Sequence, residues 1–150
     1  MSLEITINSD IKAAMIAKDK RKLEALRAIK SALLLIKTGK DTSFAEIPKE
    51  LELKTLQKLI KQRKESARIY KEQNREEQYD EEMYQAGIIE KYLPAQMSEE
   101  DISKIVDDII SKTGASSMKD MGKVMGMAAK QLAGKADNSQ VSKLVKEKLS

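Results

Sequence analysis

The sequence of 150 residues contains no cysteine and no histidine. Without thiols or imidazoles, the chain has no Cys or Ser–His nucleophile system, no disulfide and none of the usual zinc ligand sets. A metal site would have to be built from oxygen ligands alone. The sequence also lacks the glycine-rich phosphate loop that ends in Lys-Ser or Lys-Thr, so activation by ATP is not supported. We therefore predict no catalytic site, no metal and no cofactor.

Aromatic residues and long apolar runs are also scarce. Aromatics make up 3% of the chain, with no Trp and a single Phe, Phe44. The core must therefore consist of aliphatic residues and Met, whereas sheets favour β-branched and aromatic residues. No apolar run approaches the ~20 residues that cross a bilayer, and the N-terminus does not have the form of a secretory signal. We expect a cytoplasmic protein with no membrane partner.

What the sequence does contain is helical periodicity along almost its whole length. Four helices are predicted in the N-terminal part, at about residues 3–18, 20–38, 49–74 and 76–92. Three shorter helices follow, opened by Ser98, Ser117 and Asp137 as capping residues. The predicted fold class is all-α: an N-terminal helical bundle of about four helices and a C-terminal three-helix unit.

Apolar side chains at three- and four-residue steps predict which helix faces are buried. In the first helix the expected stripe is Ile5, Ile11, Ala14 and Met15. In the second helix it is Leu23, Leu26, Ile29, Leu33 and Ile36.

Other residues indicate where the predicted helices begin and end. Asp19 is expected to cap the second helix and Gly39 to end it, with residues 40–48 as a loop. The short connection at Asn74 predicts an antiparallel hairpin. Pro94 disfavours helix at Leu93, which predicts a domain boundary there, with domains at 1–93 and 94–150.

The sequence resembles a known family at several motifs. In the C-terminal part these are Gly114-Ala-Ser-Ser-Met-Lys-Asp-Met-Gly-Lys-Val-Met-Gly126 and the stretch that begins Gly134-Lys-Ala-Asp-Asn. In the N-terminal part they are Lys18-Asp-Lys-Arg21, Gln62-Arg-Lys-Glu-Ser66 and Glu90-Lys-Tyr-Leu-Pro-Ala-Gln-Met-Ser98. These motifs look like those of the YqeY family over essentially the whole chain. Residues from about 95 to 150 also resemble the tail domain of the B subunit of the bacterial glutamyl- and aspartyl-tRNA amidotransferase.

The resemblance implies a function in contact with tRNA. In the amidotransferase the tail domain helps to hold tRNA, while the chemistry resides in other domains and another subunit. Stand-alone YqeY proteins carry the inherited label of a carbon–nitrogen ligase with glutamine as nitrogen donor. Kinship alone does not transfer a site, so the residues must be judged by themselves.

The candidate nucleic-acid-binding residues lie in the C-terminal part. Lys119, Lys123 and Lys130 follow each other at steps of four and seven, which places them on one helix face, and Lys135 follows the Gly134 cap. Such a row of cations suits a phosphate backbone, and a solvated charged face is the alternative. Gly122 and Gly126 indicate close packing of helices, or close approach of a ligand to the helix backbone.

Other charged groups have simpler interpretations. Residues 1–40 carry nine Lys/Arg against four Asp/Glu, and a basic cluster there could steer RNA or an acidic partner: Lys18, Lys20, Arg21, Lys22, Arg27 and Lys30. The acidic run from Glu76 to Glu82 is expected to complement a helix dipole rather than to form a catalytic or metal cluster. Ser116-Ser117 and Asp137-Asn138 are expected to be caps.

Three hypotheses for function follow. The leading one is an accessory protein without its own catalytic site, which binds tRNA or a tRNA-handling enzyme such as an aminoacyl-tRNA amidotransferase or synthetase. The second is participation in transamidation of mischarged tRNA together with amidotransferase subunits. The third is a protein–protein adaptor with a soft apolar groove formed by Met121, Met125 and Met127, for which burial in the core is the alternative.

Overall fold

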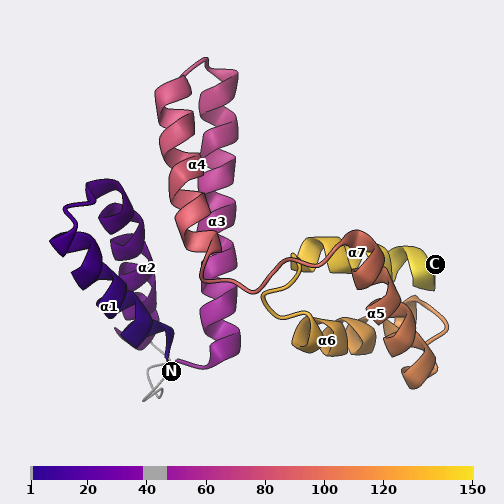
Figure 1. Cartoon of the computed structure of the whole chain (residues 1–150). Coiled ribbons are helices and arrows are strands. Elements are labelled where there is room, and N and C mark those ends of the chain that lie inside the picture. Colours follow the sequence, from indigo (N-terminus) through magenta and orange to yellow (C-terminus); the bar gives the residue numbers. More distant parts are fainter. Residues whose placement is uncertain (1, 39–46) are drawn as a thin grey trace. The chain divides into compact units, whose positions relative to one another are not determined.

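The computed structural model describes residues 2–38 and 47–150. Within these residues it contains α-helices and one 3₁₀ turn and no β-strand, which confirms the all-helical class (Figure 1). The elements are α1 Leu3–Ile16, α2 Lys20–Thr38, α3 Lys49–Glu72, α4 Glu76–Glu90, α5 Glu99–Thr113, η1 Met118–Asp120, α6 Met121–Gln131 and α7 Asn138–Leu149.

The chain divides into two compact units, Met1–Leu93 (unit 1) and Pro94–Ser150 (unit 2). Each unit has its own cluster of buried aliphatic side chains. None of the helices in the described ranges combines the length and the apolar character that crossing a membrane requires.

The first helix of unit 1 ends earlier than predicted, and only part of its predicted apolar stripe, Ile11 and Ala14, packs in the core. Lys18 has a φ of 56°, in the left-handed region, so the chain leaves the helix after Ile16 instead of continuing to Lys18. Ile7 and Ala14 are buried, whereas Ile5 and Met15, which we expected in the buried stripe, are more than half exposed. The prediction was wrong for Ile5 and Met15 because α1 has apolar residues on several sides, and periodicity alone does not choose between them.

The second helix agrees with its prediction. The Asp19 carboxylate accepts a hydrogen bond from the Lys22 amide at 3.2 Å, which confirms the expected cap. Leu26, Ile29 and Leu33 are almost completely buried, with Leu23 and Ile36 packed against the same cluster. Gly39 and residues 40–46 of the predicted loop lie outside the described residues.

A hydrogen bond joins α1 to the end of unit 1. The Tyr92 hydroxyl, two residues after α4, donates to the Asp10 carboxylate at 2.5 Å. Burial raises the pKa of the Tyr92 phenol, and the hydrogen bond to Asp10 and the charge of Asp10 raise it further. The chain is thus fastened to α1 just before it enters the connection at Leu93–Pro94.

Helices α3 and α4 pack side by side as an antiparallel hairpin (Figure 1). Both are about two residues shorter than predicted, and Pro48 is the N-cap of α3. Asn74 forms the turn with a φ of 59°, a conformation that Asn tolerates better than most residues. Between the helices, the Arg63 Nε donates to Oε1 of the buried Gln85 at 3.2 Å.

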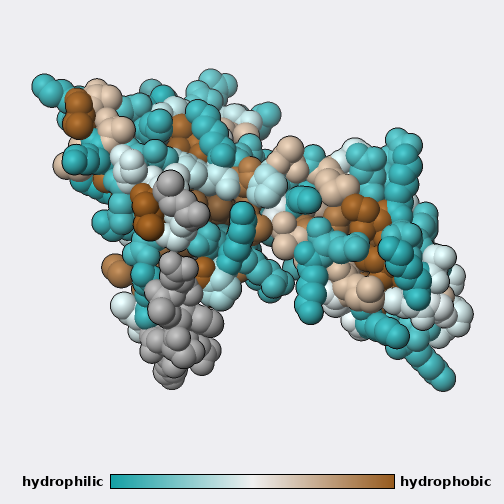
Figure 2. Space-filling view, turned by 60° about the horizontal axis from the view of Figure 1, so that its bottom comes forward, coloured by the Kyte–Doolittle hydropathy of each residue, from teal (hydrophilic) through white to brown (hydrophobic). Residues whose placement is uncertain are grey.

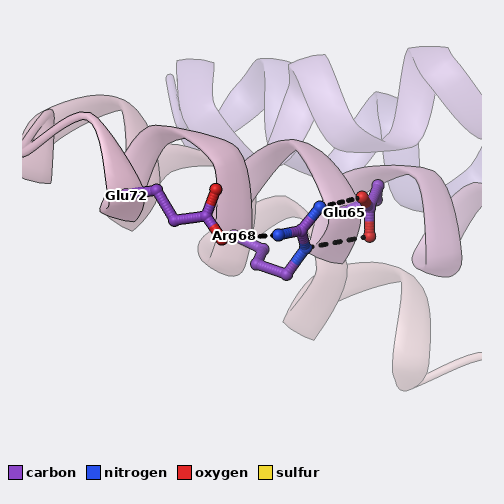
Figure 3. A network of polar contacts seen from close by, with 3 residues as sticks. All are labelled: Glu65, Arg68 and Glu72. Atoms are coloured by element: carbon purple, nitrogen blue, oxygen red, sulfur yellow. Dashed lines mark hydrogen bonds and ion pairs between the residues drawn. The ribbon is translucent and has the colours of Figure 1, made fainter.

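The outer surface of this hairpin carries charge pairs within one helix. Arg68 binds the carboxylates of Glu65 and Glu72, three and four residues away along α3, each at 2.6 Å (Figure 3). The pKa of Glu65 is lowered by its hydrogen bond to Arg68 and by the guanidinium charge. All three side chains are more than half exposed, so the network contributes little to stability.

Unit 2 consists of three helices around one aliphatic core, as expected. The Ser98 hydroxyl accepts from the Asp101 amide at 3.2 Å at the start of α5, and Gly114 ends that helix with a φ of 67°. Asp137 caps α7 by accepting from the Ser139 amide. Apolar residues of the three helices supply the core, whose fully buried members include Ile102, Val106, Val124, Ala128, Val141 and Val145.

Candidate nucleic-acid interface

Helix α6 has a buried side and an exposed side. Val124 and Ala128 are completely buried in the core of unit 2. Lys123 and Lys130 are exposed, and a step of seven residues places them on one face about 10 Å apart along the axis. The helix therefore presents two cations in one direction, as the spacing predicted.

Lys119 does not lie on that helix. We predicted one continuous helix from Ser117, but residues 118–120 form the 3₁₀ turn η1 and α6 begins only at Met121. The tighter turn follows from local hydrogen bonds: the Ser117 hydroxyl accepts from the Lys119 amide, and the Asp120 carboxylate accepts from the Ser116 amide. Lys119 is exposed immediately before α6. Because it lies outside the helix, helical spacing does not place it on the face that carries Lys123 and Lys130.

Lys135 is held by its backbone. Gly134 has a φ of 74°, which ends the α6 region as predicted, and the Lys135 amide donates to the Leu132 carbonyl at 2.9 Å. The Lys135 carbonyl accepts from the Met97 amide at 2.9 Å, and the Gln96 side chain donates to the Gly134 carbonyl at 2.8 Å. The backbone of this turn is fixed while the Lys135 side chain remains exposed.

Charge is unevenly distributed over unit 2. Five carboxylates lie on α5 and none on α6: Glu99, Glu100, Asp101, Asp107 and Asp108. Three other lysines pair with this acidic helix, through Lys104–Glu100, Lys112–Asp108 and Lys148–Asp107. In the described part of the chain no ion pair is found for the four candidate lysines, so their charges face solvent. Lys143 and Lys146 of α7 are exposed too, although no motif of the sequence singled them out.

The two glycines of α6 face open space. A Cβ built on Gly122 or on Gly126 has no neighbouring atom within 4 Å in the described structure. Among the described residues, the structure therefore gives no support to close helix packing at this pair. Each glycine costs a helix about 1 kcal/mol relative to Ala, and no contact inside the described structure offsets that cost. The sequence already indicated that these glycines are exposed, because helical spacing places them away from the apolar face formed by Val124 and Ala128.

The other candidates have structural explanations. Glu81 of the acidic run pairs with Arg21 at 3.0 Å, and Arg21 also lies 4.0 Å from the centre of the Tyr84 ring. No group of three potential ligands that could hold a metal is found among the described residues. Met121 and Met125 pack against the core of unit 2 and Met127 is exposed, so the three methionines do not share one surface.

The chain is similar to known proteins. The model of the family described as Yqey-like protein matches residues 4–149. The E subunit of the glutamyl-tRNA(Gln) amidotransferase of Methanobrevibacter smithii is 42% identical over 57 residues, covering 35% of this chain and 9% of that protein. Altered inheritance of mitochondria protein 41, mitochondrial, of Meyerozyma guilliermondii is 38% identical over 88 residues, covering 59% of this chain and 44% of that protein.

These relatives are longer than the matched part, since the chain spans less than half of either one. The partial match to an amidotransferase component supports the kinship that the motifs predicted. Because the family model extends from the first helix to the last, the chain belongs to the YqeY family.

Proposed function

We propose that this protein is an accessory tRNA-binding module, related to glutamine-dependent aminoacyl-tRNA amidotransferases, that binds RNA through unit 2. The observation that carries the proposal is the exposed side of α6, where unpaired Lys123 and Lys130 flank the open backbone at Gly126. Lys119 before the helix and Lys135 after it are exposed as well, and we propose that they add to this cationic surface. The two compact units are proposed to be separate domains, of which unit 2 makes this contact.

The chemistry of unit 2 favours recognition of backbone and shape. Residues 94–150 contain no Phe, Tyr or Trp, so they offer no aromatic platform on which an unpaired base can stack. Lysines bind phosphates without reading sequence, and an exposed helix backbone permits an approach that a side chain would block. The proposed ligand is therefore a double-helical part of tRNA, and the relative from Methanobrevibacter smithii belongs to an amidotransferase whose own name contains tRNA.

A matched pair of variants tests the proposal. Replacing Lys123 and Lys130 by Gln removes two charges from α6, and replacing Lys104 and Lys112 by Gln removes two from α5. We expect only the α6 variant to weaken tRNA binding strongly and to reduce the slope of log K against log salt, by up to about 1.8 for two lost phosphate contacts. Binding and salt dependence are measured by titration at several ionic strengths. If both variants lost the same amount of tRNA affinity, the loss would reflect the net charge of the protein and not a site on α6, which would contradict the proposal.

Gly126 gives a second test that separates folding from binding. Gly126→Gln adds bulk to a helical position with open space around it, so it should not disturb the fold. Because Gln is a better helix former than Gly, we expect higher stability together with weaker tRNA binding. If the free energy of unfolding and the affinity for tRNA changed in the same direction in this variant, the result would contradict an interface at α6.

A role in transamidation is the second candidate function, and the match to the amidotransferase of Methanobrevibacter smithii favours it. In this case the protein acts only with amidotransferase subunits. The pure chain is expected to release no ammonia from glutamine, and adding it to a transamidation reaction should change the rate of amide formation. Turnover by the isolated chain, lost on a single substitution, would contradict both candidate functions.

A further inference from the structure

Helices α1 and α2 follow each other directly and pack together as a second hairpin, the α1–α2 hairpin, which exposes an unusual share of the large hydrophobic side chains. Among the nine large hydrophobics that are exposed in the described residues, five lie in this hairpin: Ile5, Met15, Ile16, Leu34 and Leu35. Ile16 is 76% exposed and Leu35 is 72% exposed. Figure 2 shows hydrophobic residues lying between hydrophilic ones on the unit that contains this hairpin. These five residues do not belong to the core, and the binding surface on unit 2 does not use them.

Cations occupy the same outer faces. On α1, Lys12 lies between Ile5 and Ile16 along the helix axis, and the three residues lie within about 40° around it, opposite the buried Ile7. On α2, Lys20, Arg27 and Leu34 follow at seven-residue steps, which places them together on the exposed side. Each helix therefore shows aliphatic and cationic side chains on one face.

The positive charge of the two helices is mostly uncompensated. Arg21 and Lys37 are held in ion pairs, whereas no ion pair is found in the described structure for the other six cations of the hairpin: Lys12, Lys18, Lys20, Lys22, Arg27 and Lys30. Three of the four carboxylates of residues 2–38 are already engaged. Glu4 pairs with Lys37, Asp10 accepts from the Tyr92 hydroxyl, and Asp19 caps α2.

We propose that the outer faces of the α1–α2 hairpin bind an anionic phospholipid surface. Aliphatic side chains that project among cations suit a membrane interface, where the apolar groups enter the headgroup boundary and the cations meet lipid phosphates. Nucleic acid would satisfy the cations but would leave the aliphatic side chains in water. A symmetric contact with a second copy would bring like charges together, because Lys12 lies between the two isoleucines of its face. The expectation of no membrane partner depended on the lack of a spanning segment, which binding at the surface does not require.

The test uses the full chain and sedimentation with vesicles of phosphatidylcholine, with and without phosphatidylserine. We expect binding only to the vesicles that contain phosphatidylserine. Lys12→Gln with Arg27→Gln should lower the partition coefficient about fivefold for each cation. Ile5→Ser with Ile16→Ser should lower it about tenfold for each side chain that enters the lipid. None of the four side chains is buried, so the variants are expected to fold, which circular dichroism checks.

Two control variants keep the test specific. Ile69→Ser with Met83→Ser removes exposed hydrophobics of α3 and α4, and should leave vesicle binding unchanged. Lys123→Gln with Lys130→Gln, which should weaken tRNA binding, should also leave it unchanged, so the two proposals can fail separately. Absence of binding to either vesicle overturns the lipid proposal. Binding that needs the cations but not the isoleucines overturns it in favour of a general polyanion site. A wild-type dimer that the isoleucine variant converts to a monomer assigns the surface to a second copy instead.

Discussion

Replacement of Gly126 by Ala offers a direct test of the exposed side of α6. The position is interior to a helix, and an added Cβ meets nothing within 4 Å. The substitution therefore adds no contact and creates no clash, and only the backbone preference of the residue changes. Ala is favoured over Gly by about 1 kcal/mol in an exposed helix interior, so the free energy of unfolding should rise by about that amount.

The expected change in melting temperature depends on how much of the chain unfolds together. A gain of about 1 kcal/mol raises the midpoint by about 4–8 °C for a domain of the size of unit 2, and by about 2–4 °C for a domain of the size of the whole chain. Differential scanning calorimetry on the wild type and the variant measures both the midpoint and the number of transitions. A larger shift confined to one of two transitions would support unit 2 as an independently folding domain.

Gly114 is the matched control. Its surroundings are equally open, but its φ of 67° is a left-handed conformation that Ala adopts with strain. Gly114→Ala should therefore lower the free energy of unfolding by about 1 kcal/mol, the opposite sign from Gly126→Ala. If Gly126→Ala failed to raise the free energy of unfolding, or if both substitutions changed it in the same direction, the space around Gly126 would not be open. Helix α6 would then lack the exposed backbone on which the proposed tRNA surface depends.

Three other substitutions have defined outcomes. Ser98→Ala removes the cap that accepts from the Asp101 amide, and should cost about 1 kcal/mol of unfolding free energy in a urea titration. Tyr92→Phe removes the hydrogen bond to Asp10 and should cost about 1 kcal/mol at neutral pH. Because folding raises the Tyr92 pKa above its ordinary 10.0, its contribution is present below that pH and is lost as the pH rises above it. The stability gap between wild type and Tyr92→Phe should therefore narrow above pH 10, and a constant gap would contradict the assignment. Arg68→Ala breaks two exposed ion pairs and should change stability by less than about 1 kcal/mol, since such pairs are screened by water, and a larger loss would show that the network stabilises the hairpin.

Strongly periodic and clearly capped segments could be predicted from the sequence. Helix α2 has a long stripe of apolar residues at three- and four-residue steps and a capping aspartate, so its bounds and the packing of that stripe were both predicted correctly. The helix starts of unit 2 were found at Ser98 and Asp137 because their side chains accept from backbone amides. These features depend on interactions a few residues apart, which a single sequence contains.

The parts that failed depend on contacts between elements or on competing local bonds. In α1, apolar residues lie on several sides, and only packing against α2 decides that Ile7 is buried and Ile5 is exposed. Lys119 was placed on the α6 helix because the sequence does not show that the Asp120 carboxylate would bond back to the Ser116 amide. The assignment of the candidate lysines to nucleic acid stays a prediction, since exposure and lack of ion pairs support it without naming a ligand.

The location of the aromatic residues gives the two units different optical properties. All four tyrosines, Tyr70, Tyr79, Tyr84 and Tyr92, lie in unit 1, and the chain has no Trp. Tyrosine absorbance and emission therefore follow unit 1 alone, while unit 2 is silent at these wavelengths. A single Trp introduced by Met127→Trp, at an exposed site on α6, would give unit 2 its own signal. Ligand binding and unfolding could then be followed separately for the two units in one sample.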